Sequence, residues 1–164
     1  MYLKPTLQWL TVKHLPQLEL LEIDSFNYPW SRKDFLHHLR NKHSRGFGLF
    51  DGNSLIGFVI FSIIGPGLVR IHNMAVAEDC QGMGYGTFLM QELLARLPSS
   101  TRDILLITEI PDYADKAIAF FCKLGFKASE VLHKYYDEIE SDVYRFEIKL
   151  EQVSAQVRSN CGRT

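Results

Sequence analysis

A glycine-rich turn between a strand and a helix constrains the fold of this chain more than any other feature. The strand is predicted over Leu68–Val76, and the glycines follow within Gln81-Gly82-Met83-Gly84-Tyr85-Gly86. Apolar side chains then recur at helical spacing, at Leu89, Met90, Leu93, Leu94 and Leu97. The first amides of a helix lack intrahelical partners and carry partial positive charge, so this turn is suited to hold a phosphate.

Two common phosphate-binding patterns do not fit the turn. No Lys-Ser or Lys-Thr pair follows the glycines, which excludes a Walker loop. Gly84-x-Gly86 does not continue as the G-x-G-x-x-G of dinucleotide-binding folds. Taken alone, the turn is equally compatible with tight packing of the helix on the strand.

The rest of the hydrophobic pattern predicts a mixed α/β chain with the element order β-α-α-β-β-β-α-β-α-β-β. Strands are expected at residues 6–12, 47–50, 55–64, 68–76, 103–110, 126–136 and 143–150. Helices are expected over 15–26, after a cap at Ser31, after Gly84, and over 117–124 with Gly125 closing the last one. We expect one domain over residues 1–150 and a polar, disordered tail over 151–164.

The composition excludes several classes of partner. The 164 residues are 46% hydrophobic, which suits a single compact domain, and the net charge of −1 offers no broad cationic surface for nucleic acid or an anionic membrane. No apolar run approaches the roughly 20 residues of a membrane helix, and the first residues lack a secretion signal. The three cysteines, Cys80, Cys122 and Cys161, form no disulfide or zinc pattern, so we expect a cytoplasmic protein without a metal.

The turn resembles the Q/R-x-x-G-x-G/A pyrophosphate loop of the GNAT acetyltransferases. Three further motifs stand in order along residues 7–150 and resemble the RimI-like branch, the ribosomal-protein-alanine N-acetyltransferases. They are Asn27-Tyr28-Pro29-Trp30-Ser31, Leu124-Gly125-Phe126, and Tyr135-Tyr136 followed by Asp142-Val143-Tyr144.

The resemblance implies a fold and a cofactor. The fold would be a central, twisted, mostly antiparallel sheet of six to seven strands with about four flanking helices. The acetyl donor would be acetyl-CoA, with its diphosphate on the glycine turn and its pantetheine arm along Asn73 to Val76, where the family's strand ends at a bulge. The cofactor-binding candidates are Met74, Ala75, Val76, Gln81, Gly82, Met83, Gly84, Tyr85, Gly86 and Thr87.

Acetyl transfer to an amine needs a base, and the resemblance places it at Glu109. Without the resemblance, Glu109 reads as a solvated carboxylate at a strand end. His72 is the second candidate base, because histidine titrates near neutral pH, although a buried, hydrogen-bonded histidine is the more ordinary reading. Arg70, His72 and Met74 alternate along the strand and should share one face. Since arginine stays protonated, Arg70 is expected to contact the substrate or pair with an acid.

The chain departs from the RimI pattern at two positions. The family's general-acid tyrosine is replaced by Phe121, and its cofactor-binding asparagine by Ala114. Either the thiolate leaves without a side-chain acid, or Tyr113 supplies the proton. Both losses also leave open a second class of protein, an acyl-CoA-binding sensor that docks to a partner.

The acceptor groove is expected at aromatic residues. The resemblance places Trp30, Tyr135 and Tyr136 along it, where flat amphipathic rings suit a peptide-sized slot, although ordinary packing explains each ring equally well. The acceptor is expected to be a primary amine, either the N-terminal α-amine of a protein or peptide or a small-molecule amine.

Overall fold

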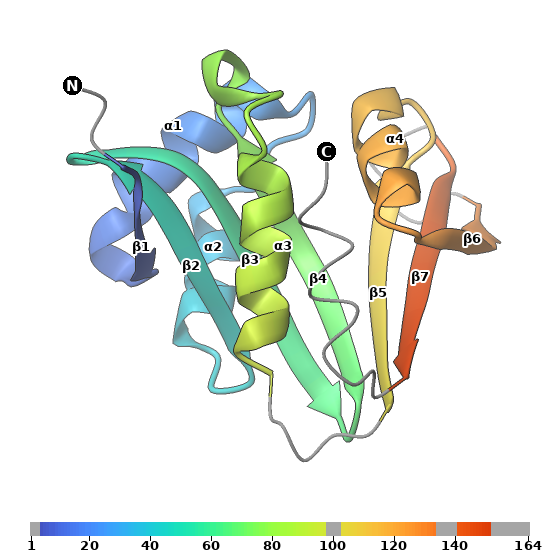
Figure 1. The fold of residues 1–164 in the computed structure, drawn as a ribbon. Helices are drawn as coiled ribbons and strands as arrows, with labels where there is room; N and C mark the ends of the chain where they lie inside the picture. The colour runs from blue at the N-terminus through green and yellow to red at the C-terminus, as the bar shows by residue number, and fades with distance from the viewer. Residues whose placement is uncertain (1–3, 98–102, 134–140, 152–164) are drawn as a thin grey trace.

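The computed structural model describes residues 4–97, 103–133 and 141–151. Within them, seven strands form one sheet in the order β1-β2-β3-β4-β5-β7-β6 (Figure 1). The strands are β1 (Thr6–Trp9), β2 (Ser44–Asp51), β3 (Ser54–Gly65), β4 (Leu68–Val76), β5 (Asp103–Pro111), β6 (Lys127–Leu132) and β7 (Val143–Glu151). The α-helices are α1 (Leu15–Ser25), α2 (Arg32–Arg40), α3 (Tyr85–Ala95) and α4 (Asp115–Lys123).

The expected element order and fold class are confirmed. The first strand is shorter than expected, because Val12–His14 forms a 3₁₀ turn in place of extended chain. The Thr11 backbone N–H donates to Nδ1 of the His14 ring at 3.0 Å, which closes this turn. The tail over 152–164 lies outside the described residues, as do Tyr135 and Tyr136. None of the described helices is long and apolar enough to cross a membrane.

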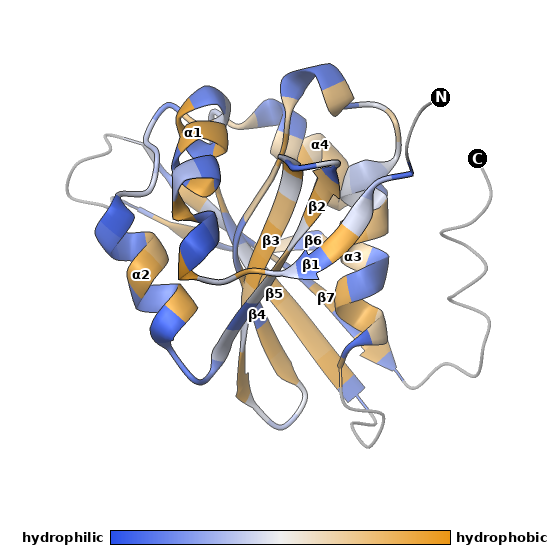
Figure 2. Ribbon diagram, turned by 90° about the vertical axis from the view of Figure 1, so that its left-hand side faces the viewer, coloured by the Kyte–Doolittle hydropathy of each residue, from blue (hydrophilic) through white to orange (hydrophobic). Residues whose placement is uncertain are grey.

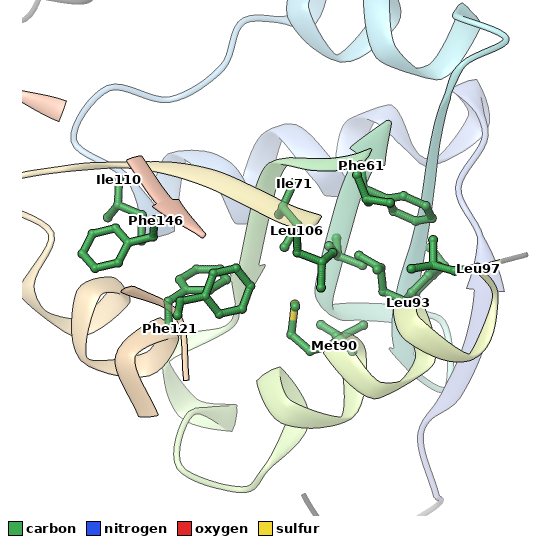
Figure 3. Close-up of a cluster of buried hydrophobic side chains, with 14 of the residues drawn as sticks. Phe61, Ile71, Met90, Leu93, Leu97, Leu106, Ile110, Phe121 and Phe146 are labelled. Carbon is green, nitrogen blue, oxygen red and sulfur yellow. The ribbon is translucent and has the colours of Figure 1, made fainter. Parts of the chain in front are cut away.

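The helices cover the sheet from both sides. The helices α3 and α4 lie on one face, and α1 and α2 lie on the other (Figures 1 and 2). The α3/α4 face carries the larger core, which includes Phe61, Leu106 and Phe121 (Figure 3). The α1/α2 face carries a second core with Phe35 and Phe58. Each such buried side chain stabilises the fold by roughly 1.5–3 kcal/mol.

The central strand β3 contributes to both cores. Val59 and Phe61 face α3 and α4, whereas Phe58 and Ile60 face α1 and α2. This is why its sequence is apolar almost without interruption.

The strands β4 and β5 form the parallel pair of the sheet and separate partway along. Their register runs from Leu68↔Leu105 to Ile71↔Thr108, after which β4 continues to Val76 and β5 to Pro111 without pairing to each other (Figure 1). Because the strands are parallel, their carboxyl ends lie at the same end of the sheet. The glycine turn after β4 and Glu109 near the end of β5 therefore lie toward the same end of the sheet.

A β-bulge at His72 changes the direction of the side chains that follow it. Ile60 pairs with Asn73 and Phe61 with Ile71, so His72 has no partner on β3. An extra residue in one strand reverses the alternation beyond it. Met74 consequently packs in the α3/α4 core, while the His72 ring contacts His38 of α2. The expectation that Arg70, His72 and Met74 share one face is therefore wrong for Met74.

Candidate active site

The glycine turn has the backbone geometry of an open helix N-terminus. Gly82 and Gly84 have φ angles of 76° and 86°, and a Cβ at either position would meet no atom within 4 Å. Gly84 is the N-cap of α3 and provides no side-chain cap, so the first amides of the helix keep their donors available. The side-chain amide of Gln81 donates to the Val76 carbonyl at 3.0 Å and ties the turn to the end of β4.

Gly86 has a different role from the other two glycines. A Cβ at Gly86 would lie 2.9 Å from Cε2 of Phe120 on α4. The missing side chain therefore allows α4 to pack closely against the start of α3. The sequence pattern alone treats the three glycines alike, and the tertiary contact separates them.

These features fit a diphosphate and an extended thioester arm. Uncapped amides at a glycine-rich helix start favour an anion. Met74 and Ala75 have their side chains directed into the two opposite cores, so this part of β4 would offer its backbone to a ligand along the edge that β5 leaves. Met83 is exposed, and Tyr85 packs against the α3/α4 core.

Glu109 lies between two arginines on the α1/α2 side of the sheet. Its side chain is only 6% exposed, so it is not the solvated carboxylate of the simpler reading. Oε2 accepts a hydrogen bond from Arg70 Nη2, and Oε1 accepts one from Arg145 Nη2 at 3.1 Å. A carboxylate oxygen can accept more than one hydrogen bond, so each oxygen retains a lone pair that can accept a proton or a water.

Sequence reasoning missed Arg145. It stands directly opposite Glu109 in the β5–β7 pair and also donates to Glu130 at 2.5 Å. Arg145 and Glu109 are 36 positions apart in the sequence, so no local pattern relates them. Only the register of β7 on β5 brings Arg145 to the carboxylate.

His72 is neutral at physiological pH. Its Nε2 lies 2.8 Å from Ser62 Oγ, and burial, together with the neighbouring His38 and Arg70, lowers its pKa to about 3. The expectation that His72 titrates near neutral pH is therefore wrong, because the ring is partly buried beside His38 of α2. A free imidazole with this pKa is a weak base.

Trp30 is fixed from two directions. Its ring stacks on His38 with centroids 4.7 Å apart and an interplanar angle of 11°. Its backbone N–H donates to Glu22 Oε1 at 2.9 Å, and Asn73 Nδ2 donates to Glu22 Oε2 at 2.8 Å. Glu22 is 2% exposed, and burial raises its pKa to about 7. A glutamate on an apolar helix face gave no signal in the sequence that it would be buried.

The positions that depart from the family pattern have structural roles. Phe121 is buried in the α3/α4 core, with its ring centroid 5.1 Å from that of Phe126. Ala114 is the N-cap of α4 and offers no side-chain cap. Tyr113 is exposed in the preceding loop, with its ring 6.2 Å from Tyr28 of the α1–α2 segment, and partial desolvation raises its pKa.

The divergent parallel strands and the glycine turn between β4 and α3 define an N-acetyltransferase. The chain belongs to the acetyltransferase (GNAT) family, whose model matches residues 15–126. The family uses acetyl-CoA as its acetyl donor.

Individual relatives confirm the likeness to the RimI branch. The N-alpha-acetyltransferase RimI of Mycobacterium tuberculosis is 28% identical over 119 residues, which cover 71% of this chain and 73% of the relative. The ribosomal-protein-S18-alanine N-acetyltransferase of Escherichia coli has a similar fold, with a TM-score of 0.78 and 23% identity over 92% of this chain and 97% of that chain.

Arabidopsis thaliana NAA60, solved in complex with acetyl-CoA, matches with a TM-score of 0.75 and 19% identity over 90% of this chain and 99% of that chain. The family assignment favours an enzyme over an acyl-CoA sensor.

Proposed function

We propose that this protein transfers the acetyl group of acetyl-CoA to the N-terminal α-amine of a protein or peptide. The observation that carries the proposal is the buried carboxylate of Glu109, held by two arginines at the end of the sheet where β4 leaves β5 and the glycine turn begins. The relative with the name N-alpha-acetyltransferase RimI supports the choice of an α-amine.

Two segments of the chain would bind acetyl-CoA. The uncapped amides from Gly82 to Thr87 would hold the diphosphate, and the free edge of β4 from Asn73 to Val76 would align the pantetheine arm. Acetyl-CoA supplies the acetyl group as a thioester, which an unprotonated amine can attack.

Glu109 is the proposed acceptor of the amine's proton, either directly or through a water. Arg70 and Arg145 hold its two oxygens from opposite strands and so fix the orientation of the carboxylate. The Arg70 side chain is 29% exposed on the same side of the sheet as Glu109, where it would meet the acceptor.

Trp30 would form one wall of the acceptor site. The ring is rigid because it stacks on His38 and meets Phe35 edge to face at 5.3 Å. Rigid aromatic walls suit an extended peptide, since little conformational freedom is lost on binding. Tyr135 and Tyr136 remain proposed wall residues on the family resemblance alone. They lie outside the described part of the chain.

A peptide panel tests this proposal. The enzyme is incubated with acetyl-CoA and one of three kinds of acceptor, and release of the CoA thiol is measured. The acceptors are peptides with a free N-terminus, the same peptides with an acetylated N-terminus and an internal lysine, and small polyamines. We expect turnover only with free N-termini. Turnover of the blocked lysine peptides or the polyamines alone would overturn the α-amine assignment and leave the acetyl transfer in place.

A further inference from the structure

Two histidines and two serines form a continuous hydrogen-bonded chain on the α1/α2 side of the sheet. His72 Nε2 lies 2.8 Å from Ser62 Oγ, and Ser62 Oγ lies 2.6 Å from Ser44 Oγ. Ser44 Oγ in turn lies 3.0 Å from Nδ1 of His38. The side chains come from β4, β3, β2 and α2, and the two imidazole centroids at the ends are 4.3 Å apart. We call these four residues the relay.

Proton counting restricts how the relay can be arranged. It contains three hydrogen bonds but only two hydroxyl protons. If both imidazoles accepted, no proton would remain between the two serine oxygens. If both donated, one hydroxyl proton would have to leave the chain. When both hydroxyl protons stay within the chain, one imidazole therefore donates to its serine while the other accepts.

Two arrangements satisfy this condition. In one, His72 Nε2–H donates to Ser62, Ser62 donates to Ser44, and Ser44 donates to His38 Nδ1. In the other, every hydrogen bond runs in the opposite direction. The two arrangements interconvert when each of the three bridging protons moves to its neighbour, so the chain is able to conduct a proton.

The two ends of the relay lie in different surroundings. His72 is the bulge residue where β4 leaves β5, and the charge of Arg70, which is paired with Glu109, acts on its ring. Ser62 is buried, whereas His38 is only partly buried and adjoins the exposed His37. A protonated amine loses two N–H protons on becoming an amide, and Glu109, held by arginines at both oxygens, is the proposed acceptor of only one of them.

We propose that the relay conducts a second proton released by the acceptor amine, besides the one that Glu109 takes, from His72 to His38 and on to solvent. This inference rests on the proposed function. After Glu109 has taken one proton of the protonated amine, a second N–H bond breaks as the amine attacks the thioester, and this proton joins His72 Nδ1. At the same time the Nε2 proton of His72 passes to Ser62, that of Ser62 to Ser44, and that of Ser44 to His38 Nδ1. His38 releases its Nε2 proton to water, so neither ring retains a charge. Tautomer exchange with water and rotation of the hydroxyls restore the first arrangement.

The surroundings of the His38 and His72 rings favour passage of the proton over its retention on either ring. Burial lowers the pKa of His38 as well as that of His72. The charges of His37 and Arg70 act in the same direction, and only Asp34 opposes them at His38. Both rings are therefore neutral near pH 7 and do not trap the proton. The Trp30 stack keeps the His38 ring in line with Ser44.

Kinetics test the relay. Ser44→Ala removes the central hydroxyl, and we expect kcat to fall about tenfold while the KM for acetyl-CoA is unchanged. Imidazole added to the buffer should restore part of the lost rate, and Ser44→Thr should recover most of it by returning the hydroxyl. Ser54→Ala, at the exposed start of β3, is the control and should match the wild type. A Ser44→Ala enzyme with wild-type kcat and no response to imidazole would overturn the proposal.

A second measurement does not depend on activity. Nitrogen chemical shifts of the histidine rings report whether His38 Nδ1 and His72 Nε2 carry protons. The relay requires that in the wild type one of these two nitrogens is protonated whenever the other is not. In Ser44→Ala the protonation of one nitrogen should no longer depend on that of the other. Two unprotonated positions in the wild type would reject the relay even in an active enzyme. A shared proton in a protein that is inactive on every peptide would count against the proposed acceptor while the relay arrangement holds.

Discussion

The backbone N–H of Trp30 donates a 2.9 Å hydrogen bond to the buried carboxylate of Glu22. The other oxygen of that carboxylate accepts from Asn73, immediately after the β4 bulge. One side chain of α1 therefore connects the Trp30 segment, a proposed wall of the acceptor site, to the strand that is proposed to hold the cofactor.

The first prediction concerns Glu22 and stability. Burial raises its pKa from 4.5 to about 7, so the folded protein binds this proton more tightly than the unfolded chain does. Stability from this group is complete below about pH 4.5 and is lost as the pH rises through 7, by roughly 3 kcal/mol in total. Glu22→Gln should remove this dependence.

Urea unfolding at pH 5 and pH 8 measures the pH dependence of the free energy of unfolding. The difference in this dependence between wild type and Glu22→Gln isolates Glu22 from the histidines that titrate in the same range. Glu19→Gln, on the same helix but paired with Arg32 at the surface, is the control. Equal pH slopes for wild type and Glu22→Gln would contradict the prediction.

The second prediction concerns Glu109. Glu109→Gln keeps the shape of the side chain but cannot accept a proton as a carboxylate does, so kcat should fall by about 10²-fold or more. Binding of acetyl-CoA, measured by calorimetry, should persist. Glu92→Gln, which removes a surface carboxylate paired with Arg96, should keep wild-type turnover. Unchanged turnover of Glu109→Gln at saturating acceptor would remove Glu109 from the reaction.

The third prediction concerns Gly84. Valine at this position must adopt a φ of 86°, and its side chain would stand at the N-terminus of α3. We expect Gly84→Val to abolish calorimetric binding of acetyl-CoA and CoA. Gly52→Val introduces comparable strain in the β2–β3 turn, at a φ of 58° with open space around it, and should bind normally. Equal affinity in both variants would refute the role of the turn.

The fourth prediction separates packing from binding at Gly86. Gly86→Ala places a methyl group against the Phe120 ring and should destabilise the fold by about 1–3 kcal/mol in thermal unfolding. Adding Phe120→Leu should recover part of this loss, because the smaller side chain makes room. If Gly86→Ala and Phe120→Leu destabilise the fold additively, the contact with Phe120 is not the reason why a glycine is needed at position 86.

Local patterns in the sequence were sufficient for most of the elements. Ser31 caps α2 by accepting from the Asp34 amide, and β4 runs over the predicted Leu68–Val76. Helical and strand periods and capping chemistry act over a few residues, so a single sequence displays them. Val12–His14 departs from the expected strand because the hydrogen bond to the His14 side chain, and not the apolar period, decides the backbone there.

The sequence by itself determined the glycine turn, the succession of strands and helices, and Glu109 as the carboxylate near the end of a strand. Only the tertiary structure decided what surrounds them: Arg145 opposite Glu109, the bulge that turns Met74 away from His72, and the burial of Glu22. These features depend on the register between strands and on contacts between residues far apart in the chain. No local period records them, since they exist only once the sheet has formed.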